Sequence, residues 1–197
     1  FAKIFGMALD ITDGTEDGAL TFETSAAGAN TAEHMRIDPT GVVGIGTTVP
    51  SSYDGFANNL VVYEAGHSGI TIATNGDNHT SIYFADGTSG NTAYRGQIDY
   101  NHNGDSLTFK VAGDVSAISI ASTGSVNMPL QPAFLVEPAS NQENIANDNS
   151  VVTVVFGTEA FDVGANFSKS GGLANAFTAP VTGKYQLQVL LRLEDVD

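Results

Sequence analysis

The sequence predicts an all-β protein, and three observations support this prediction. Lys, Arg and Glu, which cover the surfaces of helices, are scarce, whereas the turn and strand residues Gly, Thr, Ser, Asn and Asp are abundant. Apolar and polar residues alternate with a period of two in short stretches that lie between turn signals. The apolar stripe typical of a helix does not occur in the sequence.

A repeated unit organises the first part of the chain. Because strands as short as those in this unit cannot bury a sizeable core alone, such units usually stack on one another or are wound together from several chains. The second copy has a shorter internal loop than the first. The matched segments are 6–10 with 96–99, 20–22 with 107–109, and 37–41 with 120–124.

Each copy of the unit contains a predicted β-hairpin. Apolar residues alternate on both sides of the turns at residues 38–41 (DPTG) and 121–124 (ASTG). Because neighbours on a strand point to opposite faces, we expect Arg36 and Asp38 to point outward from the assembled protein. The residues that we expect to point inward are Ile37, Ile45, Ile118 and Ile120.

The glycines of residues 41–46 are spaced almost as in a phosphate-binding loop. Such a loop needs Lys and then Ser or Thr after its last glycine, at the start of a helix that faces the phosphate. Here Gly46 is followed by residues 47–50 (TTVP), which favour an extended chain, and the third glycine of a dinucleotide fingerprint is missing. We therefore interpret these glycines as scaffolding.

Further short strands are expected between the two copies. They are separated by turn signals at residues 64–66, 75–77 and 86–87. The expected strands are residues 60–63, 69–72, 81–84 and 97–100.

Residues 35–50 (MRIDPTGVVGIGTTVP) resemble the "MRIDssGnVGIGTTsP" repeat of phage tail fibres and related virion appendages. Residues 81–102 resemble the unit that commonly lies between such repeats. The resemblance covers roughly residues 5–128 and implies an elongated homotrimeric β-structured fibre shaft at residues 1–128. The family often ends in a chaperone that cleaves itself off, and no segment of this chain matches that domain.

The expected domain boundary is residues 129–132 (PLQP), because two prolines this close disfavour a central strand. The order of residues beyond it resembles the C1q/tumour-necrosis-factor-like jelly roll. This resemblance implies that residues 129–197 are the N-terminal half of a trimeric ten-stranded β-sandwich with Phe156, Phe177 and Tyr185 in its core. The matching residues are Phe134, Phe156, Phe161, Asp162, Gly164, Phe167, Phe177, Pro180, Gly183 and Tyr185.

The predicted second domain includes expected strands at residues 133–136, 151–156 and 185–193, with a polar loop before Ser150. The last of these strands alternates apolar and polar residues, so it needs a partner strand and a second sheet. We therefore expect the native protein to continue beyond Asp197 for about 60–70 residues, the remainder of a jelly roll.

Two groups of acidic residues are candidate calcium ligands. Asp99, Asn101, Asn103 and Gly104 fit the first half of an EF-hand loop, but its twelfth position is Lys110, a cation, so a hairpin turn is preferred. A second acidic group lies in an expected loop, where a solvated turn is preferred over a calcium site. Its members are Asp10, Asp13, Glu16 and Asp17.

No catalytic, cofactor-binding or metal-binding residues are predicted. His34, His67, His79 and His102 share no metal-ligand spacing, and none is paired with a local acid and Ser as in a nucleophile motif. The acidic residues include no recognisable pair for glycoside hydrolysis. The absence of Cys excludes disulfides and thiolate chemistry.

The net charge of the chain limits the classes of molecule that it is expected to bind. Lys and Arg number 7 against 22 Asp and Glu, a net charge of −15, which disfavours nucleic acid and anionic membranes. With the resemblance, this predicts an extracellular, homotrimeric virion fibre without catalysis. Its expected partners are other virion proteins and a host surface glycan or protein receptor. The alternatives are a secreted carbohydrate-binding adhesin of bacterial origin and a fibre-borne polysaccharide depolymerase.

Overall fold

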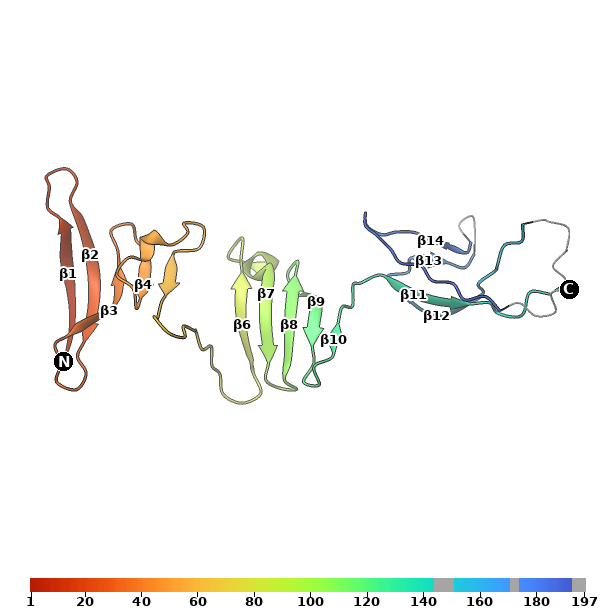
Figure 1. Ribbon diagram of the computed structural model, residues 1–197, viewed down its shortest axis with the longest axis horizontal. Helices are drawn as coiled ribbons and strands as arrows, with labels where there is room; N and C mark the ends of the chain where they lie inside the picture. Colours follow the sequence, from red (N-terminus) through yellow and green to blue (C-terminus); the bar gives the residue numbers. More distant parts are fainter. Residues whose placement is uncertain (144–150, 171–173, 193–197) are drawn as a thin grey trace. The chain divides into compact units, whose positions relative to one another are not determined.

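The computed structural model describes residues 1–143, 151–170 and 174–192, and the described chain is all-β (Figure 1). Its described part contains strands and short 3-10 helices, and none of its helices has the length and apolar character needed to cross a bilayer. The all-β prediction is confirmed. Contacts divide the chain into two compact units, Phe1–Ile72 and Ala73–Asp197. The boundary expected at residues 129–132 stays a prediction.

The first unit contains one five-stranded sheet with the order β1-β2-β3-β4-β5. Neighbouring strands are antiparallel except β4 and β5, which are parallel and are joined by a connection that contains the 3-10 helix η1 (Pro50–Ser52). The strands are β1 (Ala2–Asp10), β2 (Asp17–Thr24), β3 (Ala32–Ile37), β4 (Val43–Ile45) and β5 (Leu60–Val62).

The second unit contains an antiparallel five-stranded sheet with the order β10-β9-β8-β7-β6, seen as a row of strands in Figure 1. The 3-10 helix η2 (Gly90–Tyr94) lies in the connection from β6 to β7. The strands are β6 (His79–Phe84), β7 (Gly96–Asn101), β8 (Ser106–Val111), β9 (Val115–Ile120) and β10 (Val126–Asn127).

Two small antiparallel sheets follow in the same unit. The first pairs β11 (Ala133–Glu137) with β12 (Thr158–Val163), and the second pairs β13 (Phe167–Ser168) with β14 (Ala176–Phe177). None of the sheets in the described residues is closed.

Aromatic side chains gather around these two small sheets. The Phe134 ring stacks on the rings of Phe167 and Phe177, with centroids 5.1 Å apart in each case. The Tyr185 ring meets Phe177 edge-on at 5.2 Å, and Phe156 meets Phe167 edge-on at 6.5 Å. Of the three residues expected in a core, Phe177 and Tyr185 therefore contact each other and Phe156 contacts Phe167, and all three are only half-buried in this chain.

Three of the expected strands do not form ladders. Residues 69–72, 151–156 and 185–192 belong to no strand of the structure, and Leu193 and residues 144–150 lie outside the described residues. Side chains such as Ile70 and Leu190 are exposed there. Residues 185–192 have the alternation of a strand, but a strand also needs a neighbour for its backbone N–H and C=O groups, and none of the described strands pairs with these three segments.

The repeated hairpin is confirmed by matching geometry. The Gly41 amide donates to the Asp38 carbonyl at 3.0 Å, and the Gly124 amide donates to the Ala121 carbonyl at 2.8 Å. Both glycines have positive φ, 85° and 81°, which glycine adopts without steric cost. Residue 37 is opposite residue 20 in the first copy, as residue 120 is opposite residue 107 in the second.

The upstream part of the predicted match is wrong. Leu20 lies opposite Gly6, whereas its counterpart Leu107 lies opposite Tyr100, so Gly96 is not the equivalent of Gly6. The reason is that the first hairpin has a longer connection, residues 11–16, than the second, residues 102–105. A short Gly and Asp match in the sequence did not reveal this difference in strand register.

Each five-stranded sheet carries apolar side chains in rows that run across its strands on one face. In the first sheet the cross-strand partners form two rows, and in the second sheet two equivalent rows occur. None of these side chains is buried. The first sheet's apolar face consists of Ile4, Leu20, Phe22, Met35, Ile37, Val43, Ile45, Leu60 and Val62. The second sheet's apolar face consists of Ile82, Ile98, Tyr100, Leu107, Phe109, Ile118, Ile120 and Val126.

The chain itself covers the opposite face of the first sheet. Arg36 and Asp38 lie on the face opposite to Ile37 and Ile45, as the alternation predicts. Within the single chain Arg36 and Asp38 are each only 7% exposed and Ile45 is exposed, and which face points outward from an assembly stays a prediction. Arg36 donates two hydrogen bonds to the Glu33 carboxylate. The Asp38 carboxylate accepts hydrogen bonds from the main-chain amides of Thr40 and Val42, in the turn that follows Asp38. On this face the connection after β4 returns to the sheet and buries Pro50. The chain thus covers the polar face itself and leaves the apolar face uncovered.

The interpretation of the glycines in residues 41–46 as scaffolding is confirmed. Gly46 has φ +75°, and its amide donates to the His34 carbonyl at 2.9 Å. A Cβ at Gly46 would overlap the Tyr63 carbonyl oxygen, and one at Gly44 would lie 3.1 Å from Pro50. These glycines therefore permit close approach of neighbouring backbone segments.

Candidate functional site

A polar face on the second sheet is the candidate site. The alternation of β6 places His79, Ser81 and Tyr83 on one side, because successive strand residues point to opposite faces. Their partners on β7 are Asn101, Asp99 and Gln97, and Lys110 of β8 lies opposite Gln97. The pleat that makes one face apolar therefore gathers these polar side chains on the other.

Asp99 is the centre of this polar group. Its side chain is only 7% exposed, and its carboxylate accepts a hydrogen bond from the Ser81 hydroxyl. The second carboxylate oxygen lies 2.9 Å from His79 Nδ1 and 3.8 Å from Lys110 Nζ. Burial alone would raise the pKa of Asp99, but the hydrogen bonds from Ser81 and His79, with the charges of His79 and Lys110, bring this pKa below its usual value. Asp99 is therefore a fixed carboxylate at neutral pH.

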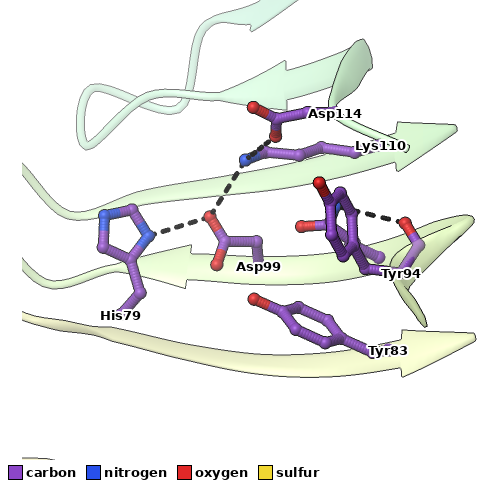
Figure 2. A pocket seen from close by; sticks show the side chains of 7 residues that line it. His79, Tyr83, Tyr94, Asp99, Lys110 and Asp114 are labelled. Atoms are coloured by element: carbon purple, nitrogen blue, oxygen red, sulfur yellow. Dashed lines mark hydrogen bonds and ion pairs between the residues drawn. The ribbon is translucent and has the colours of Figure 1, made fainter. Parts of the chain in front are cut away.

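Lys110 connects Asp99 to a second carboxylate. Its Nζ lies 2.8 Å from Asp114, which is exposed in the turn between β8 and β9. The hydrogen bond to Asp114 is the largest cause that raises the pKa of Lys110 above its usual value. The resulting chain of interacting side chains, His79–Asp99–Lys110–Asp114, is drawn in Figure 2.

Gln97 holds the surrounding loops against this group. Its amide nitrogen donates to the main-chain carbonyls of Gly113, in the β8–β9 turn, and of Tyr94, at the end of η2. Gly113 has φ +97°, and a Cβ there would lie 3.0 Å from the Asn91 side chain, so the turn requires glycine. One side chain on a strand thus positions both Asp114 and Tyr94.

These residues line an open cavity of about 310 Å³ on the polar face (Figure 2). Two aromatic rings form part of its wall, since the Tyr83 and Tyr94 centroids lie 6.3 Å apart with their planes inclined by 51°. The lining residues are His79, Tyr83, Tyr94, Gln97, Asp99, Lys110 and Asp114. We call this cavity the β6–β8 pocket.

The hydrogen-bond pattern of the pocket suits binding rather than nucleophilic attack. In a catalytic triad the His lies between the Ser and the Asp, and it takes the proton of the Ser hydroxyl. Here Asp99 lies between His79 and Ser81, and the Ser81 hydroxyl donates to the carboxylate instead. A carboxyl with a lowered pKa is also a poor proton donor at neutral pH, unlike the general acid of a glycosidase.

The structure uses the EF-hand-like residues in a hairpin, as preferred from the sequence. Asn101 accepts a hydrogen bond from the Asn103 amide, and Gly104 has φ +99° in the turn between β7 and β8. Asp99 points to the pocket group instead, and Lys110 lies beside it. Lys110, at the twelfth position of the motif, therefore pairs with Asp99 at the first position.

The acidic group at residues 10–17 forms a solvated turn. Asp10 accepts a hydrogen bond from the Thr12 amide at 2.8 Å, which lowers the pKa of Asp10, and Glu16 accepts one from the Gly14 amide. In the part of the chain that the structure describes, no three His, Cys, Asp or Glu side chains gather as a metal site would need.

The four histidines have different surroundings. His34 and His67 are exposed, and His102 lies against the Tyr100 ring with its Nε2 3.3 Å from the Thr80 hydroxyl. Only the position of His79 beside Asp99 adds to the candidate site, and no motif in the sequence predicts this contact. The signal was the alternation of polar residues at 79, 81 and 83 and at 97 and 99, which indicates a polar face but not which residues meet.

Fold and site together define an all-β protein whose described sheets are open, and one of these sheets carries a polar pocket. Comparison of the chain with protein-family models, with curated proteins and with solved structures gave no match.

Proposed function

We propose that the chain is part of a homotrimeric virion fibre that serves host attachment and has no catalytic activity. The observation that carries this proposal is the pair of uncovered apolar faces, one on each five-stranded sheet, with rows of apolar side chains of which none is buried. Fully burying a Val, Leu, Ile or Phe side chain contributes about 1.5–3 kcal/mol, so leaving these rows in water forfeits much of the possible stability.

Identical chains are the simplest cover for these faces. Copies related by a rotation axis present the same apolar rows to one another, and closed symmetry is the usual form of soluble homo-oligomers. The choice of three copies is supported by the resemblance of residues 35–50 to the virion-fibre repeat. The polar faces, which this chain already covers or satisfies by itself, would then point outward.

The proposal extends to the residues after 128 as the N-terminal part of a C1q/tumour-necrosis-factor-like knob. The support is the aromatic group of Phe134, Phe167, Phe177 and Tyr185, whose rings pack between two incomplete sheets. Two-stranded sheets are marginally stable alone, so further strands or neighbouring chains are needed to complete this domain.

Particle association tests the virion role. An antibody raised against the chain should detect it in purified particles from its source and, by immunogold labelling, on an appendage of the particle. The proposed partners, other virion proteins and a host surface receptor, would be recovered by cross-linking on such particles. A chain that is secreted freely and absent from particles would contradict the virion role and favour an adhesin of bacterial origin.

A further inference from the structure

We propose that the β6–β8 pocket binds one neutral saccharide residue, so that the second sheet makes contact with glycans. This inference deepens the proposed attachment role and depends on it for its biological meaning. The binding itself follows from the chemistry of the pocket in a single chain.

The size of the pocket selects a small ligand. Its volume of about 310 Å³ lies at the lower end of the range for small-molecule sites, which is about 300–1,000 Å³. That volume accommodates a ligand of the size of a saccharide residue and not a folded partner.

Donors and acceptors of the pocket are fixed in place. The carboxylate of Asp99 is held by Ser81, His79 and Lys110, and Lys110 is itself held by Asp114. Groups with fixed positions lose little conformational freedom when a ligand binds. Carboxylate acceptors beside an ammonium donor suit vicinal hydroxyl groups, each of which both donates and accepts hydrogen bonds.

Aromatic rings supply the apolar part of the contact. Tyr83 is 57% exposed at the edge of the pocket, and Tyr94 lies beside it on η2. The C–H face of a sugar ring is apolar and packs against an aromatic face, while a Tyr hydroxyl remains available for hydrogen bonding. The pocket therefore offers both surfaces that a saccharide presents.

Charge disfavours the other ligand classes. Two carboxylates against one lysine repel phosphate, sulfate or an acidic sugar, within a chain of net charge −15. Lys110 lies between the two carboxylates and opposes a metal cation. An apolar ligand would remove water from the polar lining without offering hydrogen bonds in its place, which is costly.

The pocket also remains open in the proposed assembly. Tyr83 and Asp99 lie on the face opposite to Ile82 and Ile98, because neighbours on a strand point to opposite sides. Association through the apolar rows therefore leaves the pocket in solvent. A trimer would carry three copies, and several weak contacts made together bind far more tightly than one.

The test is saturation-transfer NMR on the full chain of 197 residues. The probes are the methyl glycosides of glucose, galactose, mannose and N-acetylglucosamine, with the methyl glycoside of glucuronic acid as the charged comparison. At least one neutral glycoside should bind with a dissociation constant on the order of 1 mM, an affinity of about −4 kcal/mol. The glucuronide should bind more weakly than the corresponding glucoside.

Variants of the chain test whether the glycoside binds in the β6–β8 pocket. Tyr83→Ala and Asp99→Asn should each weaken it about tenfold or more, whereas Tyr53→Ala, which removes an exposed tyrosine from the other unit, should leave it unchanged. Tyr83 is exposed, so its replacement keeps the fold even if Asp99→Asn does not, and circular dichroism checks this. No binding by any neutral glycoside, tighter binding of the glucuronide, or equal binding by Tyr83→Ala would overturn the inference.

The mass of the same sample separates this inference from the proposed function. A trimer that binds no saccharide would contradict the pocket assignment and leave the fibre proposal standing. A monomer that binds saccharide, with loss of binding in Tyr83→Ala, would support the pocket and contradict the trimeric fibre.

Discussion

Gly46→Ala is expected to destabilise the first sheet more than Gly41→Ala does, although both glycines have positive φ. Gly46 has φ +75° and Gly41 has φ +85°, so an alanine at either position is strained. The two sites differ in their surroundings. A Cβ at Gly41 meets nothing within 4 Å, whereas one at Gly46 overlaps the Tyr63 carbonyl oxygen.

Tyr63 has little freedom to move away from a new Cβ. Its amide donates to the Ile45 carbonyl at 2.9 Å, and this bond ties the end of β5 to β4. The left-handed strain costs about 1–2 kcal/mol at either position. Overpacking against held backbone adds about 1–3 kcal/mol at Gly46 only, for a total of about 2–5 kcal/mol.

Thermal unfolding measures the difference. In a protein of this length 1 kcal/mol corresponds to about 2–4 °C in Tm, so Gly41→Ala should melt about 2–8 °C below the wild type and Gly46→Ala about 4–20 °C below it. Both variants are compared with the wild type by calorimetry at one protein concentration, because association makes Tm depend on concentration. Equal Tm values, or a lower Tm for Gly41→Ala, would refute the role given to Gly46.

Three further predictions concern the apolar face, the buried carboxylate and the aromatic group. Ile37→Asp should abolish assembly, because an unpaired charge would be buried at a cost of several kcal/mol per chain, whereas Ile11→Asp, in an exposed turn, should assemble normally; sedimentation shows which occurs. The lowered pKa of Asp99 stabilises the fold above the ordinary carboxyl pKa of about 3.9, and this contribution is lost as the pH falls through the lower folded-state pKa. Tm measured from neutral to acid pH should therefore decline less steeply below about pH 4 for Asp99→Asn, and an unchanged slope would contradict this linkage. Phe134→Ala should cost about 1–3 kcal/mol, given its half-burial, and Leu135→Ala, on the exposed side of the same strand, should cost less; comparable losses in denaturant titrations would argue against the aromatic group.

Most hairpins and strands of the two five-stranded sheets could be predicted from local patterns in the sequence. Turn residues and a period of two are properties of neighbouring residues, so the hairpins at residues 38–41 and 121–124 could be placed without knowledge of the fold. The failed strands at residues 69–72 and 185–192 show the limit of such patterns. Alternation describes a strand's faces, but a strand exists only where another segment pairs with its backbone.

The burial of each sheet face and the cross-strand register could not be predicted from the sequence. Alternation predicts that Arg36 lies on the face opposite to Ile37, but it does not predict that the connection after β4 covers this face or that Glu33 pairs with Arg36. The β6–β8 pocket could not be predicted from the sequence either. His79, Asp99 and Lys110 come from three strands, and their meeting depends on cross-strand register, which the sequence does not specify.

The mass of the soluble chain in solution tests the central claim most directly. The claim is that the uncovered apolar rows of the two sheets are buried between three identical chains. Sedimentation equilibrium should give three times the chain mass of 20.4 kDa, independent of concentration over the accessible range. A folded, stable species of 20.4 kDa would contradict the claim, because the apolar rows would then remain in water.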